Sequence, residues 1–198
     1  MTHTAILLAA GQSSRMGTLK GLLPWNGTTL FEHQLNTLRK SVFTDIVVVL
    51  GYEADTFHSI GKKYSANMII NEHFQDGKCS SIIAGVKAAD ALSDTILITS
   101  VDQPLHTEVI NKLAGDFRKT RCLIAVPSCQ GKRGHPILFS SRLRNELLSI
   151  KEENMGLRHV IQQHKQFLLE VPVENEQIHL NLNRQEDYKI AVKTYTGR

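Results

Sequence analysis

Uninterrupted runs of apolar residues recur along the chain and predict buried strands. The first run, Thr4–Ala9, leads into a glycine, and the runs Asp45–Gly51 and Asp94–Val101 are rich in β-branched residues. The absence of polar alternation is typical of parallel strands that are covered on both faces. Shorter strands are expected at Asn67–Asn71, Arg121–Val126 and Phe167–Val173.

Apolar side chains also recur at intervals of three and four residues, which predicts amphipathic helices between the strands. The first helix places several of them on one face: Phe31, Leu35, Leu38 and Val42. The stretches Ser80–Leu92 and Val109–Phe117 repeat this pattern. Other helices are expected at Glu53–Tyr64, Arg142–Ile150, Gly156–Gln163 and after Asn183.

The alternation of strands and helices predicts the fold class. The elements follow one another at intervals that suit βαβ crossovers, so we expect a single α/β domain with a mostly parallel sheet and helices on both faces. The rhythm changes after Val126, where Gly131–Gly134 separates the apolar stretches Cys122–Pro127 and His135–Phe139. This spacing predicts a hairpin-like or antiparallel addition to the sheet.

The predicted sheet also indicates where a ligand binds. In an open α/β sheet, ligands bind beyond the carboxyl ends of the strands. The candidate site therefore consists of the loops after Ala9, Leu50, Asn71, Val101 and Asn181.

Composition narrows the class of ligand and partner. The 198 residues carry 23 Lys+Arg against 19 Asp+Glu, a net charge of +4. This mild excess suits a phosphorylated small molecule. Nucleic acid is not expected, because no Lys/Arg run exceeds a pair and no aromatic residues interleave with basic ones.

The cysteines and the apolar runs indicate the compartment. Three cysteines without a CxxC pair favour a reducing cytoplasm over a secreted disulfide scaffold. No apolar stretch approaches the ~20 residues of a membrane helix. The amino terminus lacks the basic region of a signal peptide. We therefore expect a cytoplasmic protein without membrane association.

The stretch LLAAGQSSRMGTLK, from Leu7 to Lys20, predicts a loop that binds an anion. Glycines let backbone N–H groups converge on phosphate oxygens, and Arg15 and Lys20 can reach a polyphosphate from two sides. Five residues separate Gly11 from Gly17, where the ATPase loop has four, and the dinucleotide fingerprint GxGxxG is absent. The alternative interpretation is a polar loop with a solvent-facing arginine and lysine.

Asp102 directly follows the predicted strand Asp94–Val101 and precedes Gln103 and Pro104. A carboxylate at the end of a buried strand needs a partner, and Mg²⁺ is a natural one next to phosphates. The alternative is that Asp102 caps the helix after Pro104. The anion loop and Asp102 together favour the metal.

Four further polar residues in the candidate loops have two interpretations each. Asn181 and Asn183 would lie on the same side of a strand, whereas Asn183 could also cap the last helix. Ser80 and Ser81 either cap the start of a helix or face the base or sugar of a nucleotide.

Lys132, Arg133 and His135 form a basic turn that either binds a second anion or is a solvated hairpin tip. The histidines and cysteines show no zinc spacing, and no GxSxG motif indicates a serine hydrolase.

Three stretches, LAAGQSSRMGTLK, VDQP and RGHPILF, resemble motifs of the MobA-like nucleotidyltransferases. Within that family the match is to the molybdenum cofactor cytidylyltransferases, including the purine-catabolism type that serves xanthine dehydrogenase, and it covers essentially the whole chain. The resemblance implies a nucleotide-diphosphate-sugar-transferase (GT-A-like) fold. It also implies Mg²⁺-dependent transfer of CMP from CTP to molybdopterin, with release of pyrophosphate. A molybdenum hydroxylase apo-enzyme is a candidate partner, and we expect a monomer or weak dimer.

The same resemblance implies roles for particular residues. Arg15, Lys20 and Asp102 would form the catalytic set, and Asp102 and Asn183 would bind the metal. Gly11, Arg15 and Lys20 would hold the triphosphate. Nucleotide binding would involve Leu8, Ala9, Ala10, Gly11, Lys20, Ser80 and Ser81, and acceptor binding Arg133, His135 and Arg158. Residues from about 1 to 120 would form the nucleotide-binding half, and those from about 121 to 198 the acceptor-binding half.

The chain departs from the family's pattern at the metal site and in the anion loop. The carboxy-terminal pattern, usually close to DxDTPED, here begins at Asn181 as NLNRQED, so amides replace both leading acids. An asparagine still offers Mg²⁺ a carbonyl oxygen, without the charge. Leu19 replaces the proline of the usual MGxPK, which leaves Lys20 in register on a less rigid loop. Ala10 resembles the cytidylyl branch, whereas guanylyl-transferring relatives tend to have glycine there.

Two other functions stay open at this level. The amides at positions 181 and 183 suit a nucleotide-binding or chaperone-like module that holds the cofactor without catalysis. The intact set of Arg15, Lys20 and Asp102 favours an enzyme instead. The other alternative is a related nucleotidyltransferase that uses GTP or a sugar phosphate.

Overall fold

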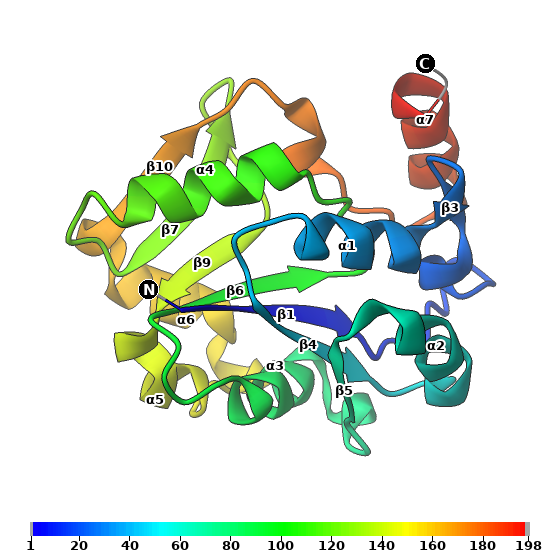
Figure 1. Ribbon diagram of the computed structural model, residues 1–198, viewed down its shortest axis with the longest axis horizontal. Coiled ribbons are helices and arrows are strands. Elements are labelled where there is room, and N and C mark those ends of the chain that lie inside the picture. Colours follow the sequence, from blue (N-terminus) through cyan, green and yellow to red (C-terminus); the bar gives the residue numbers. More distant parts are fainter. Residues whose placement is uncertain (1, 197–198) are drawn as a thin grey trace.

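One mixed β-sheet runs through the centre of the molecule (Figure 1). The computed structural model describes residues 2–196. The strand order is β10-β7-β9-β6-β1-β4-β5, with the short β8 paired to β7. The strands of the sheet are β1 His3–Ala9, β4 Asp45–Leu50, β5 Asn67–Ile70, β6 Thr95–Ser100, β7 Ile124–Cys129, β8 Lys132–Arg133, β9 Ile137–Ser140 and β10 Leu168–Pro172. A separate ribbon pairs β2 Pro24–Trp25 with β3 Thr28–Thr29.

Most neighbouring strands run parallel. β1 pairs in parallel with both β4 and β6, β4 with β5, and β10 with β7. β9 lies antiparallel between β6 and β7, where Ile124 is opposite Phe139 and Ala125 opposite Leu138. The mostly parallel sheet and the antiparallel addition after Val126 are therefore confirmed.

Helices cover both faces of the sheet (Figure 1). The helices α1 Leu30–Arg39, α2 Ala54–Gly61 and α4 Thr107–Phe117 pack on one face, and α3 Lys78–Ala88, α5 Arg144–Leu147 and α6 Leu157–Gln163 on the other. Successive residues of β1 supply both layers, since Leu7 packs with the first set and Ile6 with the second. Every residue of β1 is buried, which explains its lack of polar alternation. Among residues 2–196, no helix has the length and apolarity that a membrane crossing requires.

Several predicted element boundaries are wrong. α1 ends at Arg39, and Val42, expected on its apolar face, lies beyond the helix and is 43% exposed. The Ser41 backbone N–H bonds the Leu38 carbonyl oxygen instead, which turns the chain toward β4. β7 begins at Ile124 rather than Arg121, and the helix expected at Arg142–Ile150 is a 3-10 turn, Ser141–Leu143, followed by the short α5.

The start of α3 shows why such boundaries escape sequence reasoning. The helix spans Lys78–Ala88 rather than Ser80–Leu92. Its N-cap is Gly77, whose φ of 104° is left-handed and favours glycine. The carboxylate of Glu152 accepts a hydrogen bond of 2.7 Å from the Cys79 backbone N–H. This cap comes from a residue far along the sequence, so no local pattern indicates it.

The chain after β10 returns to the carboxyl ends of the parallel strands and ends in α7 Gln185–Tyr195. Leu182 is fully buried in a small cluster around Trp25, and its backbone N–H donates to the Asp102 carbonyl oxygen at 2.9 Å. Asn181 and Asn183 flank Leu182 in an irregular segment, so the strand expected there is wrong. Arg184, not Asn183, is the N-cap of α7.

Candidate active site

A cleft of about 430 Å³ opens at the carboxyl ends of β1 and β6. Its walls come from the loop after β1, the start of α3, the turn after β6 and the segment before α7. The lining residues are Leu8, Ala10, Gly11, Ser13, Lys20, Phe74, Gly77, Lys78, Ser81, Ser100, Val101, Asp102, Gln103, Asn181 and Asn183. The cleft thus brings together four of the five loops expected to form the site, and within the described chain the loop after Leu50 does not line it.

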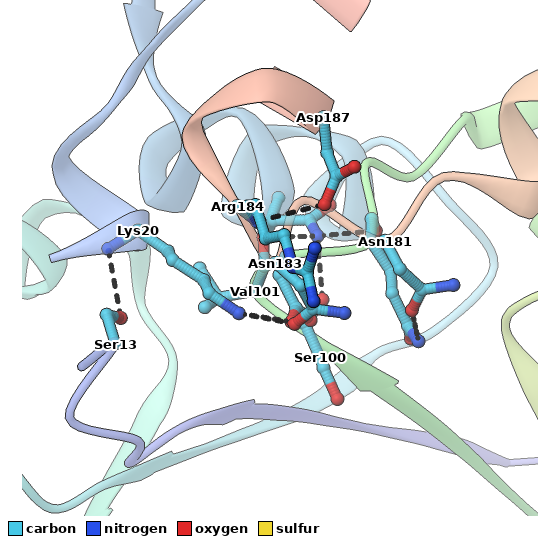
Figure 2. Close-up of polar contacts among 11 residues, drawn as sticks. Ser13, Lys20, Ser100, Val101, Asn181, Asn183, Arg184 and Asp187 are labelled. Atoms are coloured by element: carbon cyan, nitrogen blue, oxygen red, sulfur yellow. Dashed lines mark hydrogen bonds and ion pairs between the residues drawn. The ribbon is translucent and has the colours of Figure 1, made fainter. Parts of the chain in front are cut away.

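The ammonium group of Lys20 joins two oxygen atoms in this cleft. Its Nζ donates to Asp102 Oδ2 at 2.9 Å and to Asn183 Oδ1 at 2.7 Å. Figure 2 shows Lys20 reaching toward Asn183 from the loop after β1. The side chains of Lys20 and Asp102 are only 12% and 18% exposed, so their attraction is screened less than that of a surface pair. A solvent-facing Lys20 is therefore ruled out.

A buried glutamine holds the turn that carries Asp102. Gln34, fully buried in α1, donates from Nε2 to the carbonyl oxygens of Ser100 (3.1 Å) and Gln103 (2.7 Å). Its Oε1 accepts from the Leu105 backbone N–H at 2.9 Å. α4 begins only at Thr107, so Asp102 does not cap it. The sequence interpretation missed Gln34, although a polar residue on the apolar face of a predicted helix was a usable signal.

Tight turns fold the loop between β1 and Lys20. Ser13 and Gly17 have φ values of 54° and 68°. Ser13 Oγ accepts a hydrogen bond of 3.2 Å from the Lys20 backbone N–H (Figure 2). Met16 is buried, and its carbonyl oxygen accepts from Gln185 of α7 at 3.2 Å. The loop is thus attached to α7, while Arg15 is exposed and does not line the cleft.

The two serines near the start of α3 lie in different places. Asn71 Nδ2 donates to Ser80 Oγ at 2.9 Å and to Ser81 Oγ at 3.1 Å. Ser81 lines the cleft, whereas Ser80 Oγ lies outside the lining and donates to the carbonyl oxygens of His73 and Gly77. Neither serine is the N-cap of α3, so that alternative is ruled out.

Of the residues expected to bind an acceptor, only His135 lies next to the cleft residues. The pKa of His135 is lowered to about 4, mainly by desolvation and also by the charges of Lys78 and His179, whereas Asp102 acts in the opposite direction. Arg133 in β8 pairs with Glu170 of β10, Nη2 to Oε1 at 2.6 Å, and Arg158 is exposed on α6. Neither arginine lines the cleft.

Lys78 is a cleft residue that the sequence interpretation missed. It is the first residue of α3 and is exposed to the cleft. The cleft walls desolvate its ammonium group and lower its pKa, whereas Asp102 and Glu152 act in the opposite direction. The sequence could have indicated Lys78, because it directly follows Gly77 in a loop that was already expected to form the site.

The donor atoms around Lys20 fit a hard divalent cation. Asp102 Oδ2 and Asn183 Oδ1 converge on one positive charge, and oxygen ligands with few carboxylates suit Mg²⁺ when phosphates complete its shell. Within residues 2–196, no cluster of three or more His, Cys, Asp or Glu side chains could hold a metal by itself. Asn181 is engaged elsewhere, because its Oδ1 accepts from Gln103 Nε2 at 2.8 Å.

Solved structures share this fold over nearly the whole chain. Rv0371c of Mycobacterium tuberculosis H37Rv has a TM-score of 0.82 at 23% identity, with 98% of both chains covered. A second structure of that protein is a complex with manganese, with a TM-score of 0.82 at 20% identity over 98% of this chain and 100% of that one. A nucleotidyl transferase from Methanothermobacter thermautotroptrophicus has a TM-score of 0.83 at 21% identity and covers 98% of this chain and 97% of its own.

The fold and the cleft define a nucleotidyltransferase of the GT-A-like fold. The chain belongs to the family of the MobA-like NTP transferase domain, whose family model matches residues 5–167. The family inferred from the three motifs is therefore confirmed.

Three relatives show what this chain is similar to. The nicotine blue oxidoreductase of Paenarthrobacter nicotinovorans is 31% identical over 81% of both chains. The molybdenum cofactor cytidylyltransferase of Escherichia coli K12 is 27% identical over 96% of both. The purine catabolism protein PucB of Bacillus subtilis 168 is 31% identical over 69% of both.

Proposed function

We propose that this enzyme transfers CMP from CTP to molybdopterin and releases pyrophosphate. The observation that carries the proposal is the Lys20 ammonium group, held by Asp102 and Asn183 in a cleft beside a glycine-containing loop. A cation, a carboxylate and an amide oxygen placed together suit a triphosphate that arrives with a divalent metal. The E. coli relative, a molybdenum cofactor cytidylyltransferase by name, supports the choice of substrates. The name of the B. subtilis relative supports a role in purine catabolism.

On the donor side, the triphosphate lies along the loop from Gly11 to Lys20. Lys20 offsets the charge that develops on the departing pyrophosphate, and its bonds to Asp102 and Asn183 hold it in the cleft before the substrate arrives. Arg15 approaches the phosphates from the exposed side of the loop. The base lies against Leu8–Gly11, where Ala10 is buried and its carbonyl oxygen accepts from the Tyr52 backbone N–H.

Asp102 and Asn183 hold Mg²⁺ when the nucleotide is bound. A metal held by these two side chains would supply charge neutralisation to the phosphates. The manganese complex of Rv0371c supports a divalent ion in a protein of this fold. The rest of the catalysis is positioning: Gln34 and Leu182 fix the backbone on both sides of Asp102.

The acceptor enters from the half of the chain that starts at about residue 121, and His135 is its nearest contact in that half. The product then passes to a molybdenum hydroxylase apo-enzyme. We further propose that the enzyme acts in the cytoplasm as a monomer or weak dimer.

The test is an assay of pyrophosphate release with Mg²⁺ and each of the four nucleoside triphosphates, with and without molybdopterin. Release that requires both CTP and molybdopterin is the expected result. If pyrophosphate release with GTP is as fast as with CTP or faster, GTP rather than CTP becomes the proposed donor. No release with any nucleotide would overturn the transfer reaction.

A second candidate function comes from the nicotine blue oxidoreductase relative, which is 31% identical. A redox reaction would use the same cleft for a dinucleotide without cleaving a phosphate bond. The same samples, supplied with a reduced nicotinamide dinucleotide and a dye acceptor, distinguish the two. Oxidation of the dinucleotide without pyrophosphate release would favour the redox reaction.

A further inference from the structure

The cleft contains a second lysine, Lys78, to which the proposed reaction gives no role. It enters from the first turn of α3, whereas Lys20 enters from the loop after β1. Lys20 is bound by Asp102 and Asn183. In the described part of the chain, the ammonium group of Lys78 makes no hydrogen bond or ion pair. The cleft therefore holds one paired and one unpaired cation.

Both carboxylates near Lys78 are already engaged. Asp102 binds Lys20, and Glu152 Oε1 accepts from the Cys79 backbone N–H at 2.7 Å. Desolvation lowers the pKa of Lys78, Asp102 and Glu152 oppose that effect, and Lys20 adds repulsion. An ammonium group that is attracted by carboxylates but bound by neither is free to take up a further anion.

His135, from the second half of the chain, lies near enough to Lys78 for their charges to interact, and His179 lies near His135. The His135 backbone N–H donates to the Ile178 carbonyl oxygen at 2.8 Å, which joins the turn after β8 to the 3-10 turn Glu176–His179. His135 and His179 are near enough to influence each other's charge, and Lys78 repels a proton on His135. A neutral imidazole N–H next to an ammonium group offers an anion a hydrogen-bond donor without a second charge to desolvate.

We propose that Lys78 binds the phosphate group of the acceptor, with His135 as its hydrogen-bonding neighbour. This inference rests on the proposed function, because a phosphorylated acceptor is what brings a second anion into the cleft. An oxygen of that phosphate forms a bond to the α-phosphorus of CTP. The bond from this phosphorus to the α–β bridging oxygen breaks, and pyrophosphate leaves with the electron pair. Two anionic phosphates must meet for this step, so each needs its own cation: Lys20 serves the donor and Lys78 the acceptor.

The test compares Lys78→Gln with Lys78→Arg and with the matched control Lys87→Gln, an exposed lysine of the same helix. At saturating CTP, Lys78→Gln is expected to raise the KM for the acceptor by roughly tenfold or more, the effect of losing a charged hydrogen bond. The KM for CTP should change by less than about twofold, because Lys20 still holds the donor. Lys78→Arg should recover most of the acceptor affinity, and Lys87→Gln should behave like the wild type.

A KM for CTP that rises as much as the acceptor KM overturns the assignment of Lys78. Turnover by the wild type in the same assay then leaves the proposed function standing.

A second measurement decides the assignment of Lys78 even if the wild type transfers nothing to molybdopterin. Inorganic phosphate is titrated calorimetrically into each protein with a non-hydrolysable CTP analogue bound. We expect Lys78→Gln to bind phosphate about tenfold more weakly than the wild type. If the wild type and Lys78→Gln bind phosphate equally well, or if neither binds it, the assignment of Lys78 is overturned.

Discussion

At the scale of single residues, the central feature of the molecule is one ammonium group between two oxygen ligands. Lys20 Nζ lies within 2.9 Å of Asp102 Oδ2 and 2.7 Å of Asn183 Oδ1, so a positive charge is stable at this point. The same oxygens are the proposed ligands of Mg²⁺. A metal bound there would compete with Lys20 and release it toward the phosphates of the donor. Asn183 in place of an acid lowers the negative charge around the metal but keeps the oxygen.

The first prediction concerns the carboxylate of this pair. Asp102→Asn keeps the shape of the side chain but removes its charge, so Mg²⁺-dependent pyrophosphate release should fall by about 100- to 1,000-fold, equivalent to about 3 to 4 kcal/mol. Asp116→Asn, which removes an ion-paired aspartate of α4 away from the cleft, is the control and should leave turnover unchanged. Near-normal turnover of Asp102→Asn would show that the charge of this carboxylate is not needed for Mg²⁺-dependent release.

The second prediction concerns Gln34, which does not itself line the cleft but bonds the backbone on both sides of Asp102. Gln34→Leu leaves the carbonyl oxygens of Ser100 and Gln103 without their buried donor, so the free energy of unfolding should fall by about 2 to 4 kcal/mol. The displaced turn should also lower kcat by about tenfold to a hundredfold at temperatures where the protein is folded. Urea unfolding and pyrophosphate release measure the two effects. Gln162→Leu, at an exposed position of α6, is the control. An unchanged kcat in folded Gln34→Leu would show that Gln34 is only structural.

The third prediction concerns the choice of base. Ala10 is buried in the cleft wall next to Gly11. Ala10→Gly removes one methyl group, and we expect the preference for CTP over GTP in kcat/KM to fall by about tenfold. An unchanged ratio of the two kcat/KM values would place the choice of base elsewhere in the cleft.

At the scale of secondary structure, α1 matters because it carries Gln34. Its N-terminus is a capping box in which Thr29 Oγ1 accepts from the Glu32 backbone N–H and Glu32 Oε2 accepts from the Thr29 backbone N–H. Glu32 Oε1 also accepts from Lys63 at 2.6 Å. The bond from Lys63 is the main reason why the pKa of Glu32 is lowered from 4.5 to about 2. This one carboxylate thus joins α1 to the 3-10 turn after α2.

The fourth prediction follows from that pKa. A lowered folded-state pKa stabilises the protein above the unfolded value of 4.5, and this stability is lost as the pH falls from about 4.5 through 2. Glu32→Gln should therefore cost about 1 kcal/mol or more at pH 7. The difference in free energy of unfolding between Glu32→Gln and the wild type should narrow steadily as the pH falls from 4.5 to 2.5. Urea unfolding across this range measures it, with exposed Glu153→Gln as control. A gap that stays constant with pH would contradict the role of Glu32.

The same scale shows what the sequence could predict and why. β1, β4 and β6 are buried on both faces, so their apolar runs carry the signal in every residue. The ends of helices were harder to predict from the sequence, because the cap of α3 comes from Glu152 and Gly77 rather than from Ser80. In the cleft, Lys20 lies in the glycine-containing loop after β1 and Asp102 in the turn after β6, so both follow recognisable strands and were predicted to act together. Lys78 and Gln34 were missed, because their roles depend on neighbours that only the fold brings to them.

At the scale of the whole molecule, three distant parts of the chain meet at Leu182. Its side chain is buried with Trp25 from β2, and its backbone N–H holds the Asp102 carbonyl oxygen. The two neighbours of Leu182 in the chain are Asn181 and Asn183, both of which line the cleft. The alternation of leucine and asparagine from Leu180 to Asn183 indicated a strand. The loop after Asn181 was expected in the site, but the contacts of Leu182 with Trp25 and Asp102 depend on an irregular segment that this alternation does not predict.

The fifth prediction tests whether this junction couples stability to activity. Leu182→Ala should lower the free energy of unfolding by about 2 to 5 kcal/mol, the usual cost of a buried leucine. It should also lower kcat under conditions where the variant is folded, because Asn183 loses its anchor next to Lys20. Leu147→Ala in α5 is the matched control. Leu147 is as buried as Leu182, but it packs in the core layer that contains α3, α5 and α6 and does not line the cleft. It should lose similar stability while keeping its kcat. If both variants keep their kcat when folded, the carboxy-terminal segment serves the fold alone, and Asn183 is held in place by its bond to Lys20 rather than by the core beneath it.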